Sequence, residues 1–176
     1  HAKLVFKGMI FDVYQWEQKM YDGTTQIFER LDRPDTVDVI AVTPEKMLII
    51  QRQRQPDRED YFLCLIGGRI EKGEDPLQAG KREMLEESGY TSEHWTLIDQ
   101  YQPTHKIQWE MFMYVARDCV KITQQHLDPG EDIELQEVTF DTFIDLVDSR
   151  KIHRIPDIIR ERCIRAKYHA PSKEAL

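Results

Sequence analysis

Residues 68–90 read GRIEKGEDPLQAGKREMLEESGY, and the rest of the chain is organised around them. Three glutamates in this stretch, Glu83, Glu86 and Glu87, are three and four residues apart, a spacing that stacks side chains on one face of a helix. Like charges placed in this way repel each other and weaken the helix unless a cation lies among them. The arrangement therefore indicates a site for a divalent metal ion.

The sequence also marks where this helix begins and ends. Asp75 is a favourable N-cap, Pro76 suits the first helical position, and Gly89 is a typical C-terminal stop. Gly80 in the interior costs about 1 kcal/mol relative to alanine, so we expect the helix to pack closely on a sheet in compensation. Before the helix, Gly67 and Gly68 allow either a tight turn or a close approach of the backbone to a ligand.

The rest of the chain predicts a mixed sheet with helices packed on it. Strands are expected at 9–16, 25–31, 37–42, 47–51, 61–66, 95–101, 107–116, 120–123 and 133–140, and further helices at 141–149 and 156–167. The Asp22-Gly23 pair predicts a turn between the first two strands, and such a hairpin must pack on the main domain or on a second subunit. We expect an N-terminal β-region at 1–36, a main domain at 37–168 and a tail at 169–176.

The composition is that of a soluble globular protein. Of the 176 residues, 40% are hydrophobic and 32% are charged, and the net charge of −8 argues against nonspecific binding to nucleic acid. No apolar run approaches the ~20 residues that a membrane-spanning helix needs. The scattered cysteines Cys64, Cys119 and Cys163 favour free thiols in a reducing compartment, and the cytoplasm is the default expectation.

The opening stretch, read as a spacing pattern, resembles the signature of the Nudix hydrolases, G-x5-E-x7-R-E-U-x-E-E-x-G-U, in which U is apolar. The match starts at Gly68 and ends at Tyr90, where an aliphatic residue is usual. The resemblance implies an α+β fold, an α/β/α sandwich with a mixed central sheet. It also implies Mg²⁺ or Mn²⁺ as cofactor and hydrolysis of a nucleoside diphosphate linked to another group. Arg82 is expected to hold a signature carboxylate in place, with Glu74 as the favoured partner.

The resemblance further assigns metal ligands. Glu83 and Glu87 are expected to be the principal ligands, and Glu86 is expected to support a further ion. The carbonyl group of Gly67 or Gly68 is expected to complete the shell. This assignment agrees with the chemistry of Mg²⁺, which prefers carboxylate oxygens and substrate phosphates.

Outside the signature, the chain is similar to ADP-ribose pyrophosphatases and related nucleotide-sugar hydrolases. The similarity rests on the N-terminal β-region, the 53–56 segment, Pro103, the acidic turn at Glu131 and the 151–152 segment. It implies a homodimer that exchanges its N-terminal strands, contact between Arg54 and the substrate, and Glu131 as the catalytic base.

The residues alone leave alternatives open at these positions. Arg52 and Arg54 share one face of an extended chain, where they either meet an anion or blunt a solvated strand edge. Asp132 and Glu134 compete with Glu131 for the role of base.

Substrate identity also stays open. Trp109, His105 and Lys106 are placed to meet a base or a distal phosphate, although Trp109 could simply pack in a strand. In this chain, Ile66-Gly67-Gly68 stands where Pro-Ala-Gly is usual at the start of the signature. Pro103 also lies closer to the signature than is general in ADP-ribose hydrolases. ADP-ribose, cleaved to AMP and ribose 5-phosphate, is the leading expectation. The alternatives are a GDP-sugar, a dinucleoside polyphosphate, an oxidised nucleoside triphosphate, or a non-catalytic nucleotide-binding module, against which the intact signature argues.

Overall fold

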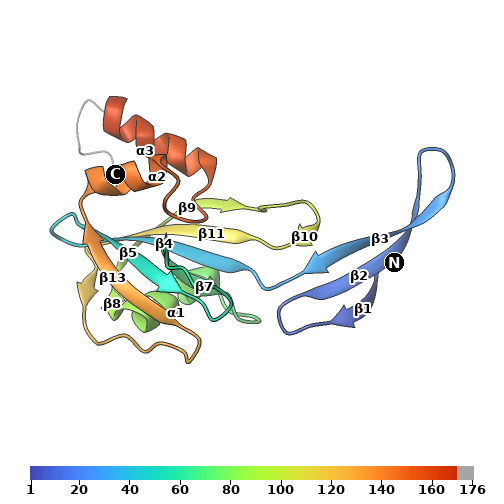
Figure 1. Ribbon diagram of the computed structural model, residues 1–176, viewed down its shortest axis with the longest axis horizontal. Helices are drawn as coiled ribbons and strands as arrows, with labels where there is room; N and C mark the ends of the chain where they lie inside the picture. Colours follow the sequence, from blue (N-terminus) through green and yellow to red (C-terminus); the bar gives the residue numbers. More distant parts are fainter. Residues whose placement is uncertain (170–176) are drawn as a thin grey trace.

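The computed structural model describes residues 1–169 and shows an N-terminal sheet that projects from a layered main body (Figure 1). The sheet has the strand order β1-β2-β3-β10. Its strands are β1 (Lys3–Lys7), β2 (Asp12–Lys19), β3 (Thr25–Asp32) and β10 (Ile107–Gln108). The predicted hairpin is confirmed as β2 and β3, whereas β1 was not predicted as a separate strand. The short β10, from the segment between β9 and β11, pairs with the end of β3, and β3 continues through residues 33–35 into β4 of the main body.

The main sheet has the order β13-β5-β4-β11-β9, with β6 paired to β5 and β7 paired to β4. Its strands are β4 (Thr36–Val42), β5 (Leu48–Arg54), β6 (Phe62–Cys64), β7 (Ile66–Arg69), β9 (His94–Tyr101), β11 (Met111–Arg117) and β13 (Asp132–Val138). β4 and β11 are parallel and the remaining pairs are antiparallel, so the sheet is mixed as predicted. The expectation that 120–123 extends this sheet is wrong, because β12 (Val120–Lys121) pairs instead with β8 (Tyr90–Thr91) after the signature helix.

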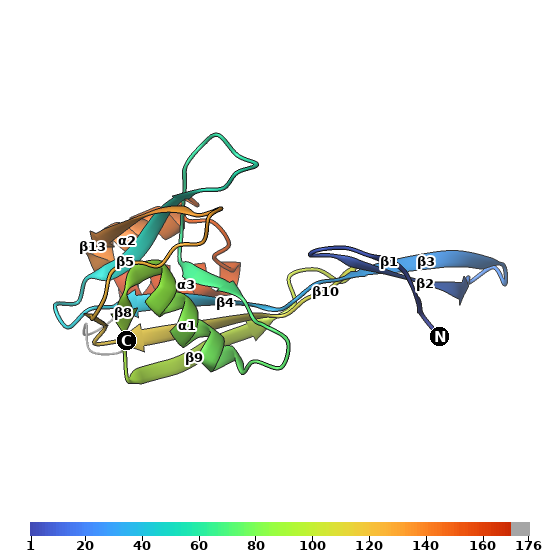
Figure 2. The ribbon, with the colours of Figure 1, turned by 90° about the horizontal axis from the view of Figure 1, so that it is seen from below.

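Helices cover both faces of the main sheet (Figure 2). One face carries α1 (Pro76–Ser88), and the other carries α2 (Phe140–Asp148) and α3 (Asp157–His169). The alternation of side chains along β4 separates the two cores. Val37 and Val39 pack with Met84 of α1, whereas Ile40 packs with Phe143 of α2. This arrangement is the predicted α/β/α sandwich.

The ends and the packing of α1 follow the sequence prediction. The Asp75 carboxylate accepts hydrogen bonds from the backbone N–H groups of Leu77 and Gln78, and Gly89 ends the helix with a φ of 74°. A Cβ atom at Gly80 would lie 3.3 Å from Val37 Cγ2, which confirms close packing on the sheet. Gly80 thus lowers the stability of the helix itself but allows the helix to lie close to the sheet.

Three further expectations concern the cysteines, membrane-spanning helices and the C-terminal tail. Cys64, Cys119 and Cys163 are free thiols, as expected. No helix in the described range 1–169 is long and apolar enough to cross a membrane. Of the predicted tail, His169 is the last residue of α3, and 170–176 lie outside the described residues.

Candidate active site

A groove of about 1550 Å³ opens beside α1, between the loop that precedes this helix, the 126–131 loop and the turn between β1 and β2. The signature residues Gly68, Arg82, Glu83, Glu86 and Glu87 all line it. The helix presents Glu83, Glu86 and Glu87 to one region because their three- and four-residue spacing keeps them on one face, whereas Gly68 comes from β7. The structure therefore brings together every signature residue for which a role was predicted.

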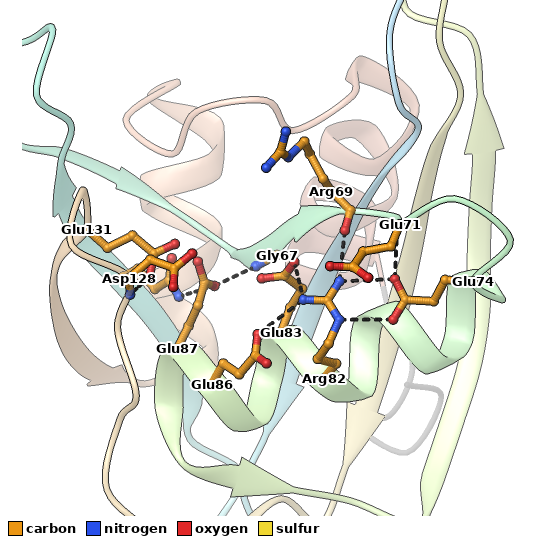
Figure 3. A network of polar contacts seen from close by, with 11 residues as sticks. Gly67, Arg69, Glu71, Glu74, Arg82, Glu83, Glu86, Glu87, Asp128 and Glu131 are labelled. Carbon is orange, nitrogen blue, oxygen red and sulfur yellow. Dashed lines mark hydrogen bonds and ion pairs between the residues drawn. The ribbon is translucent and has the colours of Figure 1, made fainter. Parts of the chain in front are cut away.

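Arg82 is the centre of the polar network on this face (Figure 3). Its guanidinium donates to Glu74 at 2.9 Å, to Glu83 at 2.9 Å and to Glu86 at 3.1 Å, and it also donates to the backbone carbonyl of Arg69 at 2.9 Å. The predicted contact between Arg82 and Glu74 is thus present, and the hydrogen bond lowers the pKa of Glu74. Arg82 ties the loop before α1 to the helix and neutralises part of the carboxylate charge.

Glu87 and Glu83 are the most buried acids of the network, with exposed fractions of 5% and 9%. Glu87 accepts hydrogen bonds from the Gln51 side chain at 2.7 Å and from the Gly67 N–H at 2.9 Å. Burial raises its pKa to about 8 in spite of these bonds. Burial also raises the pKa of Glu83 in spite of Arg82 beside it. The surroundings of both carboxylates therefore disfavour their charged form.

The donor set suits a hard divalent cation, although the side chains are not gathered around one point. Within the described residues, no three His, Cys, Asp or Glu side chains form a cluster that could hold a metal ion. Glu83 accepts a hydrogen bond from Arg82, and Glu87 accepts one from Gln51. The available donors are carboxylate oxygens, which Mg²⁺ and Mn²⁺ prefer. A Cβ atom at Gly68 would come within 2.4 Å of Glu83 Oε1, so this glycine leaves the space that the carboxylate occupies. The residues fit such a cation in chemistry, and binding would require their side chains to turn.

Glu131 reaches the same groove from the loop before β13. The backbone N–H of Asp128 donates to Glu131 Oε2 at 2.9 Å, which holds the carboxylate on its own loop. Figure 3 shows this pair beside Glu87, and the charge of Glu131 contributes to the raised pKa values of Glu83 and Glu87. Glu131, which is far from the signature in sequence, thus lies on the same side of the groove as the signature glutamates.

Asp132 and Glu134, the two other candidates for the catalytic base, lie outside the lining of the groove. Asp132 accepts from Arg54 at 2.7 Å and from the Tyr61 hydroxyl at 2.8 Å, and Glu134 accepts from Arg52 at 2.8 Å. These pairs follow from the antiparallel register of β5 and β13, which sets Asp132 opposite Arg54 and Glu134 opposite Arg52. Neither acid is among the residues that line the groove, whereas Glu131 is.

The predicted substrate-binding residues lie outside the lining of the groove. Arg52 and Arg54 flank the ring of Tyr61, with guanidinium carbons 3.7 and 5.0 Å from its centroid. Trp109 donates from Nε1 to Thr36 Oγ1 at 3.0 Å. It therefore packs against the protein, which is one of the two alternatives that the sequence left open. The structure places these three side chains in protein contacts rather than on the groove surface.

Several groove residues were not predicted. They are Arg33, Gln51, Arg69, His126, Asp128 and Arg154, of which Gln51 lies behind Glu87 and the others line the groove. Gln51 carries only a weak signal in the sequence, because it directly follows the apolar residues 48–50 of β5, and its full burial and its partner Glu87 are visible only in the structure. The arginines carry none, since they are far apart in the chain.

A comparison with protein families finds one family that matches a range containing the signature. The family described as NUDIX domain matches residues 32–158, which is well over half of the chain. The chain belongs to the Nudix hydrolase family. Strands β1 and β2 and most of β3 precede the matched range, whereas β10 lies within it.

Relatives of this Nudix hydrolase include two bacterial proteins that it matches over most of their length. An ADP-ribose pyrophosphatase of Bacillus subtilis (strain 168) is 29% identical over 151 residues, covering 85% of this chain and 82% of that protein. A methanol dehydrogenase activator of Bacillus methanolicus is 27% identical over 157 residues, covering 88% and 85% respectively. A crystal structure of an ADP compounds hydrolase has a TM-score of 0.75 at 21% identity, covering 94% of this chain and 90% of that one. This structural likeness confirms the fold.

Proposed function

We propose that this Nudix hydrolase cleaves the diphosphate bond of a nucleoside diphosphate linked to another group, with Mg²⁺ or Mn²⁺ as cofactor. The observation that carries the proposal is the meeting of the signature glutamates with Glu131 on one groove of about 1550 Å³, a volume sufficient for a nucleotide-sized ligand. ADP-ribose is the leading substrate, with AMP and ribose 5-phosphate as products, and the similarity to an ADP-ribose pyrophosphatase supports this choice. The free cysteines of the described chain favour a cytoplasmic location.

Each carboxylate has a part in the proposed reaction. Glu83, Glu86 and Glu87 would hold the cation, with the Gly68 carbonyl as a further ligand. When bound, a divalent cation neutralises charge on the diphosphate and activates water for attack on phosphorus. Glu131 would accept the proton of that water, because it is the acid from another loop that borders the same carboxylates.

Arg82 would act through its neighbours. Its hydrogen bonds to Glu83 and Glu86 hold these carboxylates toward the groove, and its bonds to Glu74 and the Arg69 carbonyl fix the loop before α1. Removal of Arg82 would therefore release both the ligands and the loop that faces the substrate.

The test is incubation of the protein with Mg²⁺ and a panel of compounds, followed by identification of the products. The panel contains ADP-ribose, a GDP-sugar, a dinucleoside polyphosphate and an oxidised nucleoside triphosphate. Release of AMP and ribose 5-phosphate from ADP-ribose is expected. Tight nucleotide binding without turnover of any panel member would overturn the enzymatic proposal and support a binding module.

Arg54 lies outside the lining of the groove, but its chain neighbours Gln53 and Gln55 line it. Arg54 is therefore proposed to contact a phosphate or the ribose where the substrate extends beyond the groove, with Arg52 and Trp109 near the bound ligand. The ion pair between Arg54 and Asp132 joins two partly exposed side chains, so solvent screens it and it contributes little to stability. We expect Arg54→Gln to raise the KM for the substrate about tenfold or more while the melting temperature changes little. An unchanged KM would leave Arg54 with a purely structural role on β5.

The N-terminal sheet is proposed to form a homodimer by strand exchange. Large apolar side chains remain exposed on it in the single chain, among them Phe6 at 60% and Ile27 at 63%. Burial against a second subunit would remove this surface from water. We expect a dimer in light scattering at micromolar concentration and a monomer for the double variant Phe6→Glu, Ile27→Glu. A monomeric wild-type protein would contradict the proposal.

A further inference from the structure

Three arginines from distant parts of the chain line the same groove as the signature glutamates. Arg33 follows β3, Arg69 ends β7, and Arg154 lies in the loop between α2 and α3. Arg69 comes directly after Gly68, whose backbone lies against the Glu83 carboxylate, so the arginines border the carboxylate side. In Figure 3, the Arg69 guanidinium points away from the glutamates.

Two of these arginines, Arg33 and Arg69, are poorly neutralised by the protein, whereas Arg154 pairs with Asp38. Among the ion pairs of residues 1–167, none involves Arg33 or Arg69. Arg33 donates from Nε to the Pro34 carbonyl at 3.3 Å, and its guanidinium lies 4.3 Å from the centroid of the Trp109 ring. Burial lowers the pKa of Arg33, and the positive charges of Arg154 and Arg69 lower it further, although Asp35 partly offsets them. Like charges held together at a groove surface favour the binding of an anion.

Arg154 is held at this surface by a buried carboxylate. Asp38 on β4 is only 3% exposed, and its Oδ1 lies 3.4 Å from the Arg154 guanidinium. It faces the α2 and α3 side of the sheet, because side chains alternate along β4 and Val37 and Val39 face α1. The buried charge therefore aims an exposed arginine into the groove. Arg154 also has a φ of 63°, a backbone conformation that costs free energy in a residue other than glycine and often accompanies function.

A second arginine of the same loop shows that this conformation alone does not create a binding site. Arg150 has a φ of 56°, yet it pairs with the exposed Asp157 at 2.9 Å and does not line the groove. The difference between Arg154 and Arg150 lies in the buried partner and in the position at the groove. Arg150 is therefore a matched control for Arg154.

We propose that Arg33, Arg69 and Arg154 form an anion subsite, the arginine subsite, which binds phosphate oxygens of the substrate, and that Asp38 is the positioning residue for Arg154. This inference rests on the proposed function, because it assigns the diphosphate of the substrate to a place between the signature glutamates and the arginine subsite. Guanidinium groups donate several hydrogen bonds in a planar fork that matches phosphate oxygens. Part of the affinity for the substrate would then come from the protein without any metal ion.

The test is titration calorimetry with inorganic pyrophosphate in the presence of EDTA, which removes the contribution of divalent metal ions. We expect wild type and Arg150→Gln to bind alike, and Arg69→Gln and Arg154→Gln to bind about 10- to 100-fold more weakly, as for lost hydrogen bonds between charged groups. Circular dichroism and melting temperature establish that each variant is folded. Arg69→Gln is informative even if Arg154→Gln is unstable, because Arg69 is exposed and has no buried partner.

The role of Asp38 needs a double-mutant cycle. Asp38→Asn should weaken pyrophosphate binding in the wild-type background and have no further effect in the Arg154→Gln background. Arg154→Lys, which keeps the charge but loses the planar fork, should bind more tightly than Arg154→Gln and more weakly than wild type. In steady-state assays, the arginine variants should raise KM more than they lower kcat.

The outcomes separate this inference from the proposed function. Absence of pyrophosphate binding by wild type in EDTA, or unchanged binding by folded Arg69→Gln and Arg154→Gln, would overturn the arginine subsite. An equal effect of Asp38→Asn in both backgrounds would remove Asp38 as the positioning residue. Failure of wild type to turn over the substrate panel, with pyrophosphate binding as expected, would overturn the hydrolytic function and leave the subsite standing.

Discussion

The two sides of the groove carry opposite charges and are assembled in opposite ways. The carboxylate side comes mainly from one helix, where local spacing sets Glu83, Glu86 and Glu87 on a single face. The arginine side gathers residues from the end of β3, the end of β7 and the α2–α3 loop. A motif confined to one helix is visible in the sequence, whereas a cluster built by tertiary contacts is not.

The two sides also differ in how burial acts on charge. On the carboxylate side, burial raises the pKa values of Glu83 and Glu87, which disfavours their charged form, and a bound cation would favour that form. On the arginine side, the buried group is Asp38, and the arginine that it holds stays partly in solvent. The first side therefore has two of its glutamates, Glu83 and Glu87, buried, whereas on the second side Arg154 is exposed and the carboxylate that supports it is buried.

The largest expected effect tests the carboxylate side. Glu87→Gln should reduce turnover at least about 100-fold, because the amide cannot carry the charge that a metal ligand needs. The fold should persist, since the amide oxygen can still accept hydrogen bonds from Gln51 and the Gly67 N–H. Activity assays with Mg²⁺ and a melting curve measure the two quantities. Glu45→Gln in the β4–β5 turn is the control and should match wild type, while near-normal activity of Glu87→Gln would reject the metal role.

An intermediate effect is expected where the loop meets the helix. Gly68→Ala would place a Cβ atom 2.4 Å from Glu83 Oε1, so the carboxylate must move. Gly68 has no positive φ, and the backbone itself can accept alanine. We expect Mg²⁺ or Mn²⁺ affinity to fall about 10- to 100-fold, as it does when groups that orient metal ligands are altered. Calorimetric titration with Mn²⁺ measures this; affinity equal to that of wild type would show that Glu83 is not a ligand.

The smallest expected effect concerns the support of the arginine side. Burial raises the pKa of Asp38, and Arg154 only partly opposes this. A carboxyl with a pKa raised on folding contributes stability at low pH, which is lost as pH rises through the folded-state pKa. Asp38→Asn does not titrate, so its melting temperature should gain a few degrees on wild type from pH 4 to pH 7, at about 2–4 °C per kcal/mol.

Neighbouring groups do not obscure this pH dependence. Tyr101 and Cys64 are the other titratable groups whose pKa values respond to Asp38, and burial raises both values to about 12. They keep their protons throughout the range of the measurement. Scanning calorimetry at several pH values provides the comparison. A constant difference in melting temperature between the variant and wild type would show that Asp38 does not titrate differently on folding.

Much of the fold could be predicted because it depends on local patterns. The caps at Asp75 and Gly89 and the hairpin turn at Asp22-Gly23 involve neighbours in sequence, and all three lie where they were expected. The separate strand β1 and the pairing of β12 with β8 could not be predicted, because strand partners are chosen by contacts between distant segments. The buried side chain of Gln51 illustrates the same limit, since its partner Glu87 comes from another element.

By itself, the sequence determined the signature helix, its caps, the carboxylate face and membership of the Nudix hydrolase family. A helix of fixed pitch converts spacing into position, so Glu83, Glu86 and Glu87 must share a face wherever the helix lies. Only the tertiary structure decided that Glu131, rather than Asp132, borders those carboxylates, because the register of β13 against β5 pairs Asp132 with Arg54. Only the tertiary structure, too, brought the arginine subsite to the groove, since no local rule relates residues that meet solely through the packing of loops around a sheet.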